Sequence, residues 1–118
     1  MGTEINTNIG KKALQDVMNS YDEALIKKEE KQAQYDAAKM QESIYAELKS
    51  KAEREFKSAQ SKYMNGDAGL LSAKSKYASA LSMFNNASTN TDILRNSLLN
   101  SIFYAGKMGN AASIAKNM

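Results

Sequence analysis

Adjacent carboxylates are the first residues in this chain whose types suggest chemistry. Asp22 and Glu23 form one pair, and Glu29 and Glu30 form another. Paired carboxylates can act as general acid and base, but adjacent residues on a helix point in different directions and cannot share one substrate. The chain has no histidine and no cysteine, which removes the commonest general base and the thiolate metal ligands. We therefore expect solvated helix surface here, and neither an enzyme nor a cofactor or metal site.

The other patterns with chemical interest also favour structural roles. The charges of the segment 27–31, KKEEK, nearly cancel, which is typical of a solvated face. Gly66 and Gly69 are too close together, and too near Asp67, for a phosphate-binding loop. The six tyrosines lack interleaved arginines and fall on apolar helix seams, and the net charge is only +3, so no nucleic-acid partner is expected. The seven methionines are interpreted as flexible packing residues.

Helical periodicity dominates the first half of the chain. The polar residues 1–10 are expected to be a flexible segment, and residues 11–64 to be one long, densely charged helix. An apolar seam with steps of three and four begins at Leu14, weakens at Lys28 and Gln32, and resumes at Tyr35. The seam predicted before and after this weak stretch comprises Leu14, Met18, Tyr21, Leu25, Tyr35, Ala38, Tyr45, Leu48, Ala52, Phe56, Ala59 and Tyr63. Two pairs of opposite charge four residues apart, Glu47 with Lys51 and Glu53 with Lys57, are expected to support the helix.

A turn is predicted at residues 65–69. Asn65, Gly66 and Asp67 are turn residues, since glycine tolerates a positive φ and Asp67 can cap the helix that follows. A second helix is predicted over residues 70–118, with an apolar face. Residues 85–92, NNASTNTD, prefer caps and turns, so intrinsic propensity favours a break or kink there.

Composition supports pairing of the two helices. The chain of 118 residues has no proline, which agrees with long uninterrupted helices. Its first 64 residues carry 11 basic and 11 acidic side chains, whereas residues 65–118 carry five and two. The first arm therefore resembles a water-facing helix and the second an enclosed one. We expect an all-α fold, a long antiparallel two-helix hairpin of coiled-coil type, without a membrane span and without a cleaved signal peptide.

The second arm also resembles a known family. Asp67, Leu70 and Leu71, Ala73, Ser79, the pairs Asn86–Ala87 and Asn90–Thr91, and finally Ile102–Phe103 match without gaps the C-terminal half of bacterial type III secretion needle proteins. The match covers about a third of the chain. The chain differs from needle proteins in three respects: it has Asn65–Ala68 in place of their Pro-x-x-Pro turn, a longer first arm, and a continuation from Tyr104 to Met118. A longer pilus or filament subunit of the same secretion class fits equally well.

The resemblance implies a structural function. It predicts a secreted protein of the bacterial cell surface that polymerises with itself into a hollow helical filament, packs into that filament as a hairpin, and conducts exported proteins. Its implied partners are further copies of the chain, the base and tip proteins of the secretion apparatus, and an export chaperone. The resemblance places the export signal in the N-terminal segment and makes segment 85–92 continuous helix in the assembled form.

Two sets of residues follow from this interpretation. Residues expected to pack between subunits are apolar: Leu70, Leu71, Tyr77, Leu81, Phe84, Leu94, Leu98, Ile102 and Phe103. Residues expected to line the channel are uncharged amides and a few cations: Asn86, Asn90, Arg95, Asn96, Asn100 and Lys107. Needle, pilus, inner rod and longer filament remain open, and the alternative function is an intracellular coiled-coil chaperone or stalk component of a secretion apparatus.

Overall fold

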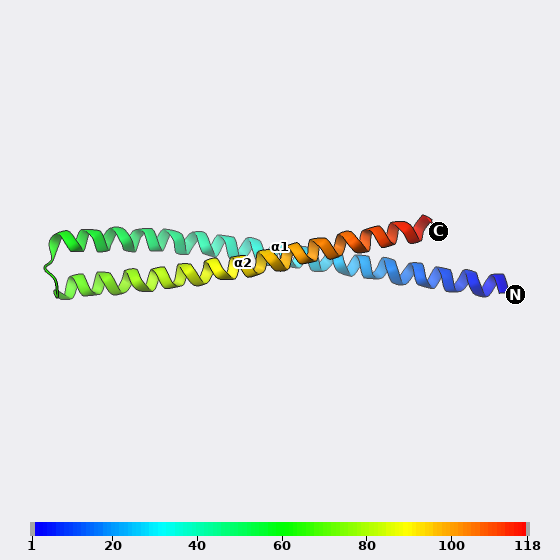
Figure 1. The fold of residues 1–118 in the computed structure, drawn as a ribbon, viewed down its shortest axis with the longest axis horizontal. Helices are drawn as coiled ribbons and strands as arrows, with labels where there is room; N and C mark the ends of the chain where they lie inside the picture. The colour runs from blue at the N-terminus through cyan, green and yellow to red at the C-terminus, as the bar shows by residue number, and fades with distance from the viewer. Residues whose placement is uncertain (1, 118) are drawn as a thin grey trace. The chain divides into compact units, whose positions relative to one another are not determined.

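The computed structural model describes the backbone of residues 2–117 and the side chains of residues 10–117. It contains two helices, α1 (Gly2–Lys62) and α2 (Ala68–Asn117), joined by one short turn (Figure 1). The predicted all-α hairpin is confirmed. Helix α1 begins at Gly2 rather than at residue 11, so the backbone of residues 2–10 continues the helix. Helix α2 runs through residues 85–92 without interruption.

The chain divides into two packing units, which are described separately. The hairpin unit, Tyr35–Leu94, contains the second half of α1, the turn and the first half of α2. The terminal unit contains residues 2–34 of α1 and 95–117 of α2. In each unit a segment of α1 pairs with a segment of α2, so each has its own inter-helix seam.

The turn is fixed by two hydrogen bonds that run in opposite directions. The backbone N–H of Asp67 donates to the carbonyl oxygen of Met64 at 3.1 Å, and the N–H of Met64 donates to Oδ2 of Asp67 at 3.0 Å. Gly66 has a φ of 91°, as the third residue of a type II turn requires. Asp67 occupies the predicted N-cap position, since its carbonyl accepts the first bond of α2, from Leu71 at 3.0 Å, while its side chain bonds back to the turn.

From Leu14 to Ala59 in α1 and from Leu70 to Ala115 in α2, the residues follow a regular heptad, labelled abcdefg, whose a and d residues are all buried or half-buried. This regularity is characteristic of a coiled coil. In α1 the a residues are Leu14, Tyr21, Lys28, Tyr35, Glu42, Lys49 and Phe56, and the d residues are Val17, Ala24, Lys31, Ala38, Tyr45, Ala52 and Ala59. In α2 the a residues are Leu70, Tyr77, Phe84, Thr91, Leu98, Ala105 and Ala112, and the d residues are Ala73, Ala80, Ala87, Leu94, Ser101, Met108 and Ala115.

Alanine dominates the buried positions. Of the eight buried apolar residues, only Leu70 and Leu98 are larger than alanine, and among the described residues no large side chain is fully buried. Small side chains let helices approach closely, so contacts between large residues are few. Phe56 and Tyr77 stack in the hairpin unit with ring centroids 5.9 Å apart. In the terminal unit, a Cβ placed on Gly109 would lie 3.3 Å from the Tyr21 ring, so the ring packs closely against that backbone.

The observed seam corrects the predicted one at several positions. Met18 and Leu25 lie at its flank and are half-buried, whereas Leu48 and Gln32 are exposed. In each case the adjacent residue in the sequence lies in the seam instead: Val17, Ala24, Lys31 and Lys49. The seam therefore contains two small residues and two lysines, which are not predicted when only large apolar side chains are assigned to it. One predicted ion pair is confirmed, with Nζ of Lys57 3.4 Å from Oε1 of Glu53, whereas Glu47 and Lys51 form no ion pair among the described residues.

Candidate functional site

The residues predicted to pack between subunits lie in two different environments. Six of the nine contribute to seams within the chain: Leu70 and Leu98 are buried, and Tyr77, Leu81, Phe84 and Leu94 are half-buried. The other three, Leu71, Ile102 and Phe103, are exposed. Only these last three are therefore available to another molecule without opening the hairpin.

An apolar surface lies on the outside of α2 in the terminal unit. Leu99, Ile102 and Phe103 are separated by three and four residues and are therefore neighbours on one helix face. All three are exposed, and Phe103 has a fractional exposure of 66%. Ile114, three turns further along α2, is also exposed. We call Leu99, Ile102, Phe103 and Ile114 the outer apolar surface. Nζ of Lys107 lies 4.8 Å from the centre of the Phe103 ring, a cation–π contact at its edge.

The residues predicted to line a channel are all exposed on α2. In the hairpin unit, Asn86 and Asn90 line one groove with Gln41 and Tyr45. In the terminal unit, Asn96, Asn100 and Lys107 occupy f and c positions, away from the seam, whereas Arg95 occupies an e position beside it. The set therefore does not form one stripe within the terminal unit.

Two hydroxyl groups are buried in the seams and both have acceptors. Thr91, 6% exposed, has its Oγ1 2.9 Å from the Ala87 carbonyl oxygen of α2 and 3.3 Å from the Ala38 carbonyl oxygen of α1. Ser101 donates to the carbonyl oxygen of Leu98 at 2.7 Å. These bonds allow polar side chains at a and d positions without unpaired buried atoms.

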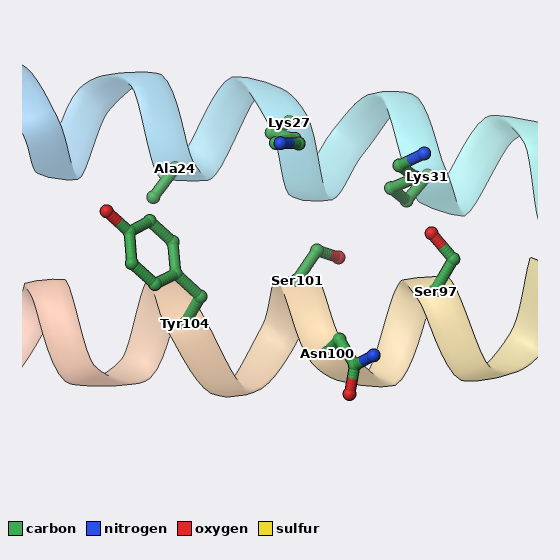
Figure 2. Close-up of a pocket in the computed structure, with 7 residues that line it drawn as sticks. All are labelled: Ala24, Lys27, Lys31, Ser97, Asn100, Ser101 and Tyr104. Atoms are coloured by element: carbon green, nitrogen blue, oxygen red, sulfur yellow. The ribbon is translucent and has the colours of Figure 1, made fainter.

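A polar groove lies between α1 and α2 of the terminal unit. Its volume is about 270 Å³, and it is lined by Ala24, Lys27, Lys31, Ser97, Asn100, Ser101 and Tyr104. Figure 2 shows the side chains of Ser97, Ser101 and Tyr104 directed into the space between the two helices, whereas Asn100 points away from α1. Two lysines and three hydroxyl-bearing residues line the groove, and both kinds of side chain can donate hydrogen bonds to an anion.

The polar groove contradicts the interpretation of segment 27–31 as solvated surface only. Lys27 is exposed, but Lys28 and Lys31 are half-buried at a and d positions of α1. A signal was present in the sequence: both lysines fall seven residues from seam residues on either side, such as Tyr21 and Ala24. Among the described residues, no group of three or more acidic side chains is arranged to hold a metal ion.

Comparisons with known proteins give no relative. No protein-family profile matches the chain, and neither the curated proteins nor the solved structures contain a significant match. Within the described residues, neither helix has a stretch apolar enough, over the required length, to cross a membrane. The family resemblance of the second arm therefore rests on its own residues.

Proposed function

We propose that this chain is a structural subunit that polymerises with itself through the outer apolar surface. The observation that supports this proposal most directly is the exposed cluster of Leu99, Ile102 and Phe103. The cluster is exposed although the a and d residues of the same helix segment are already buried or half-buried within the chain. Water-exposed apolar side chains gathered on one face favour association, because their burial contributes roughly 25 cal/mol per Å². The hairpin therefore supplies its own fold and presents a separate surface for assembly.

The type of polymer follows from the resemblance of the second arm. We infer a hollow filament of a type III secretion system, located at the bacterial cell surface, in which exported proteins pass along the channel. The charge-dense α1 faces solvent, and the sparsely charged outer residues of α2, which include Asn96, Asn100 and Lys107, face neighbouring subunits and the channel. Filaments require such a heterologous contact, because an interface that does not close on itself can repeat.

Electron microscopy and sedimentation over a range of protein concentrations test polymerisation. We expect the wild-type chain to form uniform filaments with a central channel. Phe103→Ser should stay monomeric with unchanged helical circular dichroism, because Phe103 is exposed and contributes little to the hairpin itself. Met40→Ser is the matched control, since Met40 is 69% exposed on α1 of the hairpin unit, and it should assemble normally.

The second candidate function is a coiled-coil chaperone or stalk component inside the cell. One observation favours it: the a and d positions are satisfied within the chain in both units, so the hairpin does not need neighbours to bury them. A stable monomer or dimer that never polymerises, with full helicity, would support this function and contradict the filament. Immunogold labelling of intact bacteria distinguishes the two locations, because only a surface filament is accessible to antibody.

A further inference from the structure

Two lysines line the polar groove without forming an ion pair among the described residues. Lys31 is half-buried at a d position, and residues three and four away from it on α1 are Lys27, Lys28, Gln34 and Tyr35. Two of these neighbours repel its ammonium group and none attracts it. Lys27 has Glu23 and Glu30 within one turn, yet neither Lys27 nor Lys31 forms an ion pair among the described residues.

The facing helix does not supply a counter-charge. Residues 95–117 of α2 contain three basic side chains, Arg95, Lys107 and Lys116, and no aspartate or glutamate. The groove wall on α2 consists instead of Ser97, Asn100, Ser101 and Tyr104. Lys31 therefore has no ion-pair partner among the described residues, and an external anion can take that place.

We propose that the polar groove binds a phosphate-type oxyanion between Lys27 and Lys31 of α1 and the hydroxyl side of α2. The two lysines supply charge-assisted hydrogen bonds, which are about twice as strong as neutral ones. Ser97 supplies a neutral donor from the opposite wall, and Ser101 can redirect its hydroxyl from the Leu98 carbonyl. None of the side chains that line the groove carries a negative charge, so an anion meets no repulsion from them.

The oxyanion has two sources, free phosphate or a phosphate ester. The shared chemistry is a dianionic phosphate group held by the lysines. Ala24 and the ring of Tyr104 form an apolar wall next to it (Figure 2), which would contact the organic part of an ester. Inorganic phosphate and phenyl phosphate therefore distinguish the sources: tighter binding of phenyl phosphate indicates an ester, and equal binding a free ion.

Isothermal titration calorimetry of the full chain at constant ionic strength tests the site. We expect millimolar binding of inorganic phosphate or phenyl phosphate by the wild-type protein. Lys31→Gln should weaken binding at least tenfold, the effect of losing one charge-assisted hydrogen bond. Lys76→Gln is the control with the same change in net charge, because Lys76 is exposed on α2 of the hairpin unit, and its affinity should equal that of the wild type.

Two outcomes would overturn the site: no binding by either probe, or equal weakening by Lys31→Gln and Lys76→Gln, which would indicate general charge attraction. Folding of each variant is verified by circular dichroism, and Ser97→Ala provides a second variant that keeps the apolar wall and removes one donor. The titration with Phe103→Ser, kept monomeric, separates this inference from filament formation. Anion binding by that variant would support the groove whether or not filaments form.

Discussion

Ala38 shows how one small residue sets the distance between the helices of the hairpin unit. It is 5% exposed, and its backbone carbonyl lies 3.3 Å from the Thr91 hydroxyl on the facing helix. A hydroxyl group on α2 can approach the α1 backbone only where the intervening side chain is no larger than a methyl group. Alanine therefore has a specific packing role here, although its helix propensity alone would explain its presence.

Enlarging this side chain should separate the helices. We expect Ala38→Leu to lower the free energy of unfolding by about 1–3 kcal/mol, because three added carbons enter a closely packed seam. Ala37→Leu adds the same atoms one residue earlier, at an exposed position, and should change stability by less than about 0.5 kcal/mol. Urea denaturation followed by circular dichroism measures both; equal effects would mean that residue 38 does not face α2.

Two glycines should respond in opposite directions to alanine. Gly66 has a φ of 91°, which a side chain adopts only with strain, so Gly66→Ala should destabilise the hairpin by about 1 kcal/mol or more. Gly106 lies within α2, and a Cβ added there meets nothing within 4 Å. Gly106→Ala should therefore stabilise the chain by about 1 kcal/mol. Thermal unfolding of both variants at one low protein concentration measures the effect. Tm shifts of the same sign in the two variants would contradict the expectation that only Gly66 requires glycine.

At the scale of the element, α2 is continuous where intrinsic propensity favours a break. Residues 85–92 contain no strong helix former except Ala87, yet they are helical. The heptad explains this, because Ala87 and Thr91 occupy d and a positions against α1 and continue the seam from Phe84 to Leu94. Packing against a partner helix outweighs per-residue propensities of a few tenths of a kcal/mol.

Exposed residues of this segment provide a test whose sign distinguishes helix from loop. Asn85 and Thr89 are exposed at b and f positions. In a helix, Asn85→Ala and Thr89→Ala should each stabilise the chain by about 0.5 kcal/mol, because alanine has the higher helix propensity. In a capping loop, the same changes would remove side-chain hydrogen bonds and destabilise it. Chemical denaturation of the two single variants and the double variant reports the sign.

The sequence predicted the elements better than the seam. Helix content, the hairpin and the turn at Gly66 followed from periodicity, the absence of proline and turn chemistry, all of which are local properties. Part of the α1 seam was predicted wrongly because Lys31 and Lys49 occupy d and a positions. The prediction assigned large apolar residues to the seam, and it therefore included Leu25 and Leu48, which lie beside the true seam positions. Lys49 is tolerated there because its Nζ lies 4.7 Å from the centre of the Phe84 ring.

The candidate sites could be predicted only in part, for the same reason. The exposure of Ile102 and Phe103 depends on which face of α2 contacts α1. That face is formed largely by alanines, and a single alanine in a sequence does not indicate whether it is buried. The polar groove depends on pairing of segments about 70 residues apart in sequence, such as Lys31 with Ser97. Local sequence patterns cannot predict such a pairing unless the alignment of the α1 heptad with the α2 heptad is already known.

At the scale of the whole molecule, accessible area indicates how much surface association could remove from water. The chain exposes 8725 Å², whereas a folded monomer of 13.0 kDa is expected to expose about 6,300 Å². The excess, about 2,400 Å², exceeds the roughly 1,600 Å² that a standard protein–protein interface buries in total from both partners. A two-helix chain therefore has ample surface for contacts with several neighbours.

Association should make thermal stability depend on protein concentration. Assembly binds only the folded state, so, once most of the protein is assembled, a tenfold higher concentration stabilises it by about 1.4 kcal/mol and raises Tm by roughly 5 °C. Phe103→Ser should abolish this dependence and leave the Tm of the dilute wild-type chain, whereas Met40→Ser should retain it. Differential scanning calorimetry over a hundredfold range of concentration measures the slope. A Tm that is independent of concentration in the wild type would mean that the outer apolar surface does not mediate self-association.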